Sequence, residues 1–585
     1  MNTAVLLKKI RTSEFTLGMT TSLIVGTIAG LGAVIFRWMI RGFQWLFFKQ
    51  GGEILIPALS DYYVILLPAI GGFIVGLLIY LFAKEAKGHG VPEVMEAVVL
   101  RGGKIRPRVS IIKSLASSIC IGSGGSVGRE GPIVQIGSSM ASAVGQWLKL
   151  PEEWTKNLVL CGTAGAISAT FNAPVGGVFF ALEVMARRTF TRGFIFVLVS
   201  SLVASLVASP FLGTKPSFTV PLYEMKSYWE VIFYIGLGIA SGLTAVAFIK
   251  LLYSCEDLFS LFRFPEYLKP AIGGLLLGIL GYFFADIFGV GYGGAYLPGG
   301  EFVTQCALDK VLMGKIAILG CLSLVFLKII ATSITIGSGG SGGVFAPSLF
   351  IGGMLGGFYG AFFHHFFPDI IAYSGAYALV GMGAVFAGTG SAPLTSIVML
   401  IEMTRDYTLT LPVIMATTLS FLLSRALLKG DIYTTKLIRR GIDVDLRVEE
   451  EVLKRIRVEE VMTKDFPTIS ASMTVRQLFN IFTKTGYHGF PVTRDGKLCG
   501  IITLNDIRPI TRRKGWQKLK VIDVATKNLI VAYPEQTLDK VIVYMGEKQI
   551  GRVPVVDRND KEKLLGVLTR EDILRAYTKS VIQKI

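Results

Sequence analysis

The sequence is poor in charged residues, in histidine and in patterned cysteine. Only 17% of its 585 residues are Asp, Glu, Lys or Arg, whereas soluble proteins average about 25%. The six cysteines form no C-x-x-C pair and show no even spacing, so neither a zinc site nor a disulfide framework is indicated. The chain has four histidines and no recognisable Ser/His/Asp or Cys/His motif. These absences argue against a soluble enzyme, and we expect no enzymatic activity.

The few charges are distributed unevenly. Residues 446–585 are about 31% charged, and the preceding residues only about 13%. The first part therefore has the composition of a membrane protein, and the tail that of a soluble one. The formal net charge of +18 is shared equally between the two parts, and membrane proteins carry excess Lys and Arg in their cytoplasmic loops. We expect a lipid bilayer, and no nucleic acid, as a partner.

Long hydrophobic runs, many of them interrupted, occupy the first part. Residues 16–35 form an apolar run behind Lys8, Lys9 and Arg11, and the run is too long for the core of a signal peptide. We interpret it as a first transmembrane helix that leaves residues 1–15 in the cytoplasm. Several later runs are shorter than the roughly 20 residues that cross a bilayer. Broken helices of this kind line cavities in membrane proteins, which favours a transporter over a simple anchor.

The strongest pattern is an internal repeat. Gly122–Gly137 aligns with Gly337–Gly352 at an offset of 215 residues, with nine of sixteen positions identical. A second match follows in the same order, an Ala-Pro pair with a glutamate nine residues after the proline: Ala173-Pro174 with Glu183, and Ala392-Pro393 with Glu402. Transporters built from two inverted halves bind substrate where the helix breaks meet. We expect two such repeats, at about 16–210 and 225–430.

Three glycine-rich breaks carry the predicted chemistry: Gly88–Pro92, Gly128–Pro132 and Gly343–Pro347. Each ends in proline, which suits the first turn of a helix, so each places unpaired backbone N–H groups and the positive end of a helix dipole at the break. Several such ends aimed at one point would hold an anion without a full cation, so the anion could still leave. The match of Gly337–Gly342 to G-x-G-x-x-G lacks the acidic residue of a dinucleotide site.

Glu130 is the carboxylate that these breaks offer. An ionisable group in an intramembrane segment is a functional candidate, and a carboxylate at a helix start mimics the anion that this start would bind. The alternative is an ion pair with Arg129, but neighbours in sequence do not face each other on a helix. We therefore favour a gating role for Glu130.

By residues, order and spacing, the three breaks resemble the signature segments of the CLC chloride channel and transporter family, over about residues 15–445. The resemblance implies an α-helical polytopic membrane protein with an inverted internal repeat and broken helices. It implies a homodimer in the plasma (inner) membrane with one anion pathway in each subunit. Glu130 would be the gate, which occupies an anion site and leaves when it is protonated or displaced. The implied anion-binding residues are His89, Gly90, Val91, Gly131, Val344, Phe345, Ala346 and Tyr433.

Two positions depart from the family pattern. His89 stands where most chloride-transporting members have serine. Its ring could donate a hydrogen bond to an anion and make binding pH-dependent, or turn aside as a packed or solvent-facing residue while backbone N–H groups bind. Val184 stands where proton-coupled exchangers usually carry a proton-relaying glutamate. Valine cannot carry a proton, so we expect channel-like chloride flow; the alternative is a chloride/proton antiporter that uses Glu183, a water chain or another site.

The tail contains a second repeat, each copy with the pattern helix, strand, strand, helix. Gly489–Val492 and Gly500–Ile507 recur as Arg552–Val555 and Gly566–Ile573. This pattern resembles a pair of CBS domains, each a small soluble α/β domain.

The resemblance implies a cytoplasmic CBS pair at 458–513 and 520–580, which a linker at 446–457 joins to the membrane part. CBS pairs often bind ATP, ADP or AMP, and the implied phosphate and ribose ligands are Thr503, Asp506, Thr569 and Asp572. The same residues are ordinary helix caps. Nucleotide binding and simple capping both remain open.

Transporters of divalent cations form a different class that also joins broken membrane helices to CBS domains. They need oxygen ligands, preferably carboxylates, inside the membrane, whereas the breaks offer Glu130 and otherwise glycine, hydroxyl and apolar groups. The expected substrate is therefore chloride or a similar small monovalent anion, and transport of it requires no cofactor.

Overall fold

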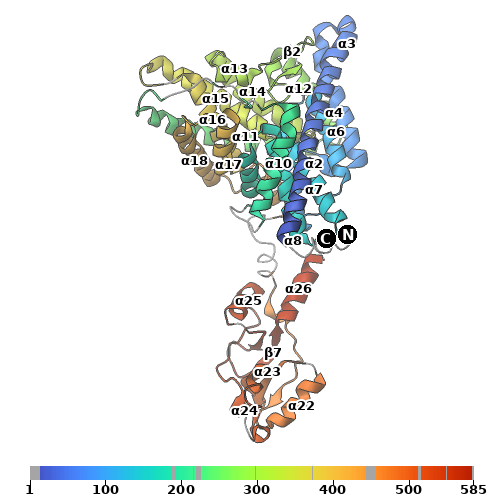
Figure 1. Ribbon diagram of the computed structural model, residues 1–585, viewed down its shortest axis with the longest axis vertical. Coiled ribbons are helices and arrows are strands. Elements are labelled where there is room, and N and C mark those ends of the chain that lie inside the picture. Colours follow the sequence, from blue (N-terminus) through green and yellow to red (C-terminus); the bar gives the residue numbers. More distant parts are fainter. Residues whose placement is uncertain are drawn as a thin grey trace, which may run out of the picture. The chain divides into compact units, whose positions relative to one another are not determined.

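The chain forms two compact units, Met1–Val444 and Asp445–Ile585. Residues 1–13 of the expected N-terminal segment and 446–452 of the expected linker lie outside the described residues. The computed structural model (Figure 1) describes residues 14–187, 193–214, 216–218, 220, 225–296, 298–371, 373–442, 453, 456–485, 487–511, 515–548 and 550–582.

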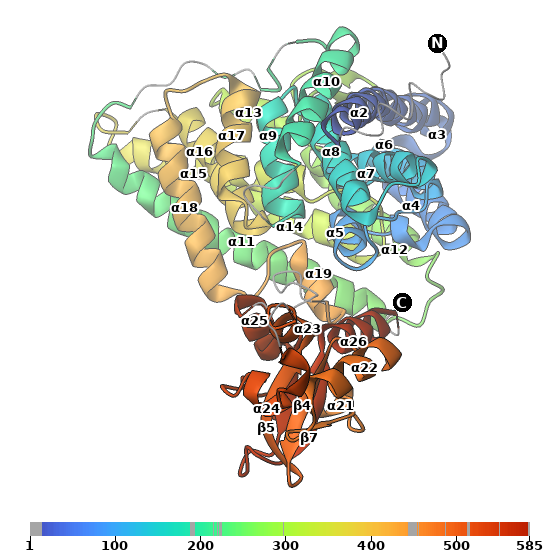
Figure 2. The same ribbon diagram turned by 60° about the horizontal axis from the view of Figure 1, so that its bottom comes forward.

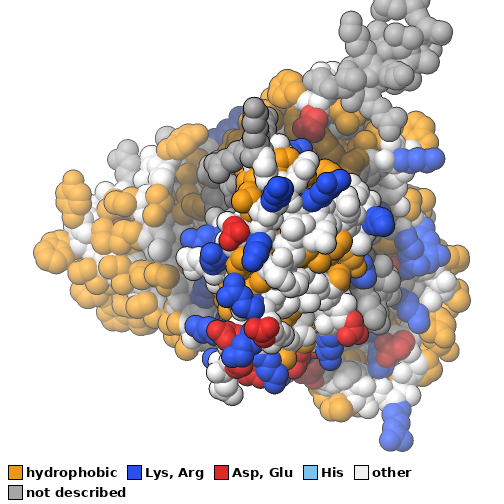
Figure 3. All heavy atoms as spheres, turned by 90° about the horizontal axis from the view of Figure 1, so that it is seen from below, with side chains coloured by type: hydrophobic (Ala, Val, Ile, Leu, Met, Phe, Trp, Pro, Cys, Tyr) orange, Lys and Arg blue, Asp and Glu red, His pale blue; other side chains and the backbone are white. Residues whose placement is uncertain are grey.

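The first unit is a bundle of helices with an apolar surface. Seven helices in the described residues are long and apolar enough to cross a membrane, and hydrophobic side chains cover the flank seen at the left of Figure 3. Other apolar helices are short, as the glycine and proline breaks predict. The helices of its first half are α2 (Glu14–Gln44), η1 (Trp45–Gln50), α3 (Gly51–Leu59), η2 (Ser60–Tyr62), α4 (Tyr63–Phe82), η3 (Lys84–Ala86), α5 (Val91–Leu100), α6 (Arg108–Gly122), α7 (Glu130–Trp147), α8 (Glu152–Phe171), α9 (Pro174–Phe179), η4 (Phe180–Met185) and α10 (Phe194–Leu212).

The second half repeats the packing of the first. Its elements are α11 (Glu230–Leu261), α12 (Lys269–Phe283), η5 (Ala285–Ile287), β1 (Ala295–Tyr296), β2 (Phe302–Val303), α13 (Ala307–Leu312), α14 (Ile318–Gly337), α15 (Phe345–Phe366), α16 (Ser374–Gly390), α17 (Pro393–Thr404) and α18 (Thr410–Leu427), followed by α19 (Thr434–Arg439). In the first half α2 packs on α10 and α7 on α8; in the second, α11 packs on α18 and α15 on α16 (Figure 2).

The two halves meet along α4 and α12 through glycine. A Cβ atom on Gly72 of α4 would lie 2.2 Å from the carbonyl oxygen of Pro270, and one on Gly274 of α12 would lie 2.1 Å from that of Pro68. The contacts are reciprocal, as they are between two copies related by a two-fold axis. Small residues let membrane helices approach closely, so these glycines set the distance between the halves.

The second unit consists of two small sheets with helices around them. β4 pairs antiparallel with β5, and β6 pairs in the same way with β7. Backbone bridges cross between the two CBS repeats in matched pairs: Arg457 with Thr537 and Thr474 with Lys520, then Thr463 with Val567 and Ile501 with Thr526. The elements are α21 (Val458–Val461), β3 (Ile469–Ser470), α22 (Val475–Thr485), β4 (Gly489–Arg494), β5 (Lys497–Thr503), α23 (Leu504–Ile507), η6 (Trp516–Lys518), α24 (Val521–Val524), α25 (Leu538–Glu547), β6 (Arg552–Val556), β7 (Leu564–Thr569) and α26 (Arg570–Ile582).

Replacing Gly274 with alanine should destabilise the membrane unit by about 1–3 kcal/mol, because the added methyl group collides with the backbone of α4. The expected result is a smaller monodisperse fraction after heating in detergent, measured by size-exclusion chromatography. Gly42→Ala in α2 is the matched control, since nothing lies within 4 Å of a Cβ atom there. Equal heat resistance of the two variants would contradict the close approach of α4 and α12.

Candidate functional site

Three helices begin at one place inside the first unit, because backbone hydrogen bonds join the three glycine-rich breaks. The N–H of Gly88 donates to the carbonyl oxygen of Gly340 at 3.0 Å, and the N–H of Gly342 donates to that of Gly88 at 3.3 Å. Gly128 and Gly343 exchange two such bonds, of 2.7 and 2.6 Å. α5, α7 and α15 therefore start beside one another, as a site built from helix ends requires.

Glycine is needed where these segments touch. A Cβ atom on Gly131 would lie 2.2 Å from the carbonyl oxygen of His89, and one on Gly343 would lie 2.6 Å from the nitrogen of Gly131. Gly90 has a φ of +83°, which L side chains rarely adopt. Six of the predicted anion-binding residues lie at the three helix starts: Gly90, Val91, Gly131, Val344, Phe345 and Ala346. Their binding of an anion remains a prediction.

Glu130, the first residue of α7, turns its carboxylate toward the start of α15. Its Oε2 accepts a hydrogen bond from the backbone N–H of Ala346 at 3.3 Å, and its Oε1 accepts one from the hydroxyl of Tyr292 at 2.5 Å. The residue exposes only 1% of its surface. The carboxylate thus lies where an anion would meet the N–H groups of α15.

Arg129 lies close to Glu130, and the expectation that their side chains point apart is wrong. The Nε atom of Arg129 is 3.9 Å from Oε1 of Glu130. Arg129 is the N-cap of α7 rather than a residue within it, so the rule that neighbours on a helix do not face each other fails there. The contact is longer than a hydrogen bond. The hydrogen bonds to the carboxylate come from Tyr292 and Ala346.

Tyr292 is a site residue that the sequence patterns did not identify. It is buried in the loop after η5, and its ring centre lies 5.0 Å from the guanidinium carbon of Arg129. This loop is the counterpart, in the second half, of the first glycine-rich break, since Gly289-x-Gly291 corresponds to Gly88-x-Gly90. The two-glycine pattern is too short to be recognised alone.

Two buried lysines hold these two loops. Lys113 of α6 donates to two carbonyl oxygens of the first loop, that of Gly88 at 2.7 Å among them. Lys328 of α14 donates to two of the second loop, that of Gly289 at 2.9 Å among them. The lysines are 215 residues apart, which is the offset of the glycine repeat. A lysine at this offset in each of two apolar runs is the signal that could have located the second loop.

His89 and Tyr433 lie side by side in the interior. Their ring centres are 6.0 Å apart, and both residues are 2% exposed. This burial excludes a solvent-facing ring for His89 and leaves the packed and the anion-binding interpretations. Neither ring nitrogen has a hydrogen-bond partner among the described residues, and a bound water or ion is one explanation for such buried groups. Lys436 of α19 pairs with Glu93 of α5 at 2.9 Å and so ties together the segments that carry the two rings.

Val184 is buried in η4, and the neighbouring Glu183 caps another helix. Glu183 accepts hydrogen bonds from the N–H (2.7 Å) and the hydroxyl (2.6 Å) of Thr395, at the start of α17. In return Glu402 of α17 accepts one from the N–H of Gly176 (2.6 Å), at the start of α9. The repeated Ala-Pro and glutamate motif is therefore a reciprocal cap of two helix starts.

The residues predicted to bind nucleotide act as helix caps in the second unit. The Asp506 carboxylate accepts hydrogen bonds from the N–H and the hydroxyl of Thr503, both at 2.7 Å. The Asp572 carboxylate accepts the same two bonds from Thr569, at 3.0 and 2.7 Å. These bonds correspond to the capping interpretation. Nucleotide binding at these residues stays a prediction.

The cation-transport alternative requires side chains that can hold a metal ion. In the described part of the chain, no group of three His, Cys, Asp or Glu side chains could hold a metal ion.

Three comparisons with known proteins agree with one another. Residues 71–425 match the family model for voltage gated chloride channels, and residues 458–510 and 521–579 match the model for CBS domains. A ClcB-like protein of Ralstonia nicotianae is 32% identical over 72% of this chain and 96% of its own. The H(+)/Cl(−) exchange transporter ClcA of Vibrio parahaemolyticus is 31% identical over 72% of this chain and 89% of its own.

The fold has solved counterparts. The crystal structure of a eukaryotic CLC transporter has a TM-score of 0.64 and 20% identity, and it covers 95% of this chain and 97% of its own. The expected architecture of broken membrane helices followed by a CBS pair is thereby confirmed. The chain belongs to the voltage-gated chloride channel (CLC) family of multi-pass membrane proteins that transport anions.

Proposed function

We propose that this protein conducts chloride, or a similar small monovalent anion, passively through a pathway in each subunit, with Glu130 as the gate. The observation that carries the proposal is the position of the Glu130 carboxylate, which accepts a hydrogen bond from the N–H of Ala346 at the start of α15. Relatives bear names of exchange transporters and of channels, so the mode of transport is argued from this chain's residues.

Glu130 can gate because it uses the same donors as a substrate anion. The ionised carboxylate is drawn to the helix end and to the hydroxyl of Tyr292. Protonation removes the negative charge and makes the group a hydrogen-bond donor, so the attraction to the N–H groups is lost. An anion can then take the start of α15.

Passive flow is supported by the side chains around Val184. Valine offers no site for a proton, and the adjacent Glu183 is held by three hydrogen bonds from the start of α17. A proton on Glu183 would weaken this helix cap, because a neutral carboxyl is a poorer acceptor. Proton transfer at this place would therefore act against the packing of α17.

His89 is proposed to donate a hydrogen bond to the anion, together with the Tyr433 hydroxyl and the N–H groups of Val344 and Phe345. The support is that both ring nitrogens are buried without a partner among the described residues. A neutral imidazole provides one N–H donor. The histidine would thus replace the serine hydroxyl found in most chloride-transporting members of the family.

The assembly is part of the proposal. Family membership supports a homodimer in the plasma (inner) membrane, with the N-terminus and the CBS pair in the cytoplasm. ATP, ADP or AMP would bind between the CBS repeats. The caps formed by Thr503 with Asp506 and by Thr569 with Asp572 would then contact the nucleotide as well as their own helix starts. Transport itself would need no cofactor and no enzymatic step.

Glu130→Gln should abolish the pH dependence of chloride flux, because the amide resembles the protonated gate and cannot ionise. We expect flux at neutral pH to equal that of the wild type at acidic pH, measured by chloride efflux from liposomes across a series of pH values. Asp61→Asn, an exposed carboxylate in η2, is the control and should keep the wild-type profile. A Glu130→Gln variant with the wild-type pH profile would refute the gate.

Reversal potentials under opposed chloride and pH gradients separate the two transport modes. For passive flow we expect the reversal potential in planar bilayers to follow the chloride gradient alone, since Val184 cannot relay protons. A constant shift with the pH gradient would instead demonstrate coupled exchange. That outcome would leave anion transport intact and overturn the passive mode.

His89→Ala should raise the half-saturating chloride concentration about three- to tenfold, because a net hydrogen bond contributes about 0.5–1.5 kcal/mol. His89→Ser restores a hydroxyl donor and should restore most of the affinity. His488→Ala, at an exposed position in the CBS unit, is the matched control. If His89→Ala and the wild type saturate at the same chloride concentration, the ring of His89 merely packs.

A further inference from the structure

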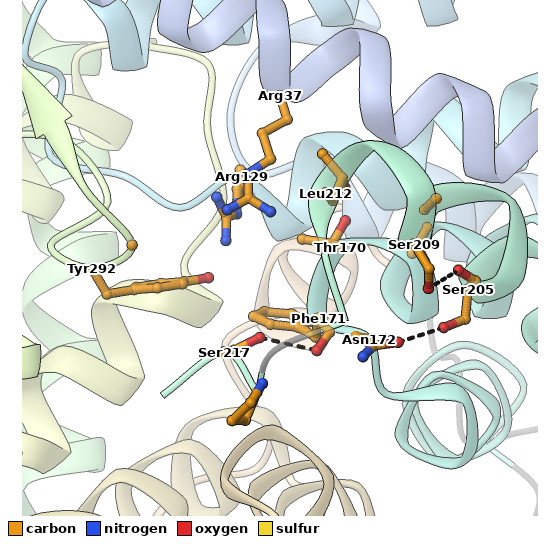
Figure 4. Close-up of a pocket in the computed structure, with 15 residues that line it drawn as sticks. Arg37, Arg129, Thr170, Phe171, Asn172, Ser205, Ser209, Leu212, Ser217 and Tyr292 are labelled. Atoms are coloured by element: carbon orange, nitrogen blue, oxygen red, sulfur yellow. Dashed lines mark hydrogen bonds between the residues drawn. The ribbon is translucent and has the colours of Figure 1, made fainter. Parts of the chain in front are cut away.

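A polar cavity of about 160 Å³ adjoins the gate. It lies between α2, the ends of α8 and α10, and the loop that carries Tyr292, and Figure 4 shows Arg37 and Arg129 pointing toward it. A water molecule takes about 30 Å³, so the cavity has room for a small anion with several waters. Its lining in the described residues contains no carboxylate.

Two arginines converge on this cavity, and the carboxylate near them is that of Glu130, which is paired with Arg129. Arg37 comes from α2 and Arg129 from the N-cap of α7, and Arg129 is only 8% exposed. The Nε atoms of both are buried and lack a hydrogen-bond partner among the described residues. The carboxylate of Glu130 lies 3.9 Å from Arg129 but is already hydrogen-bonded to Tyr292 and Ala346. Two like charges that are largely withdrawn from water favour an anion between them.

The remaining polar groups of the lining are occupied within the protein (Figure 4). Three hydroxyls donate hydrogen bonds to protein acceptors instead of to the cavity: Ser209 to the carbonyl of Ser205, Ser205 to the side chain of Asn172, and Ser217 to the carbonyl of Phe171. The guanidinium groups are therefore the charged donors left for a ligand. Guanidinium holds anions through several N–H groups in one plane.

We propose that a small inorganic anion binds in this cavity between Arg37 and Arg129 and forms an entry site directly before the gate. The proposal rests on the proposed transport function and adds a binding step to it. Tyr292 lines the cavity and donates to Glu130, so the site and the gate share a residue. Basic groups at a pathway mouth raise the local concentration of anions, and the anion next moves to the position that the Glu130 carboxylate leaves.

The test measures flux through the full-length protein in planar bilayers while chloride is varied on one face at a time against gluconate. Arg37→Gln should raise the half-saturating chloride concentration on one face about tenfold, as expected for a lost charged hydrogen bond, and leave the other face unchanged. Arg37→Lys keeps the charge, so its half-saturating chloride concentration on that face should lie between those of the wild type and Arg37→Gln. Arg425→Gln, an exposed arginine of α18, is the matched control.

A chemical rescue keeps the test valid if the glutamine variant folds poorly. Arg37→Cys is treated with a positively charged or a negatively charged methanethiosulfonate reagent, and the wild type with its six cysteines is treated alike. Only the positive reagent should return the half-saturating concentration toward that of the wild type. Superimposable saturation curves of wild type and all Arg37 variants would overturn the entry site alone. Absence of any anion flux in the wild type would overturn the proposed function as well.

Discussion

The membrane unit is organised around the backbone N–H groups at the starts of α5, α7 and α15, which have no partner within their own helices. A membrane interior offers such donors no water, and each helix start adds a partial positive charge, so their meeting point requires a negative group. The Glu130 carboxylate supplies it at the start of α15. Glycine makes the convergence possible, because a side chain on Gly131 or Gly343 would collide with a neighbouring backbone. In the proposed mechanism, the attraction of these N–H groups for a negative charge therefore closes the pathway with Glu130 and opens it to an anion.

The repeat provides the scaffold that holds these starts in place. Lys113 and Lys328, in equivalent positions, each bind the carbonyl oxygens of a loop beside the site. Glu183 caps α17, which carries Glu402, and Glu402 caps α9, which leads directly into the η4 segment that carries Glu183. The lysine contacts lie within one half each, whereas the glutamate caps cross between the halves, so neither half can complete the caps alone. Duplication thus explains both the fold and the presence of charged residues within it.

Local sequence was sufficient for the features that depend on backbone chemistry. The three breaks and Glu130 could be located because glycine, proline and an isolated carboxylate in apolar surroundings have few other uses. It was not sufficient for Tyr292, which lies in a loop with a weak pattern, or for Arg37, which looks like one more charge near the end of a membrane helix. The side-chain contact between Arg129 and Glu130 was predicted wrongly, because the helix start falls between the two residues.

The sequence by itself determined the class of the protein: low charge, the repeat at an offset of 215 and the glycine-rich breaks identify a membrane anion pathway with a CBS tail. Only the tertiary structure decided which groups surround Glu130, because Tyr292, Ala346 and Arg37 come from elements far from it in the chain. The physical reason is that the two kinds of feature depend on residues at different distances along the chain. Backbone conformation follows from neighbours within a few residues, whereas the partners of a buried charge are set by how distant helices pack.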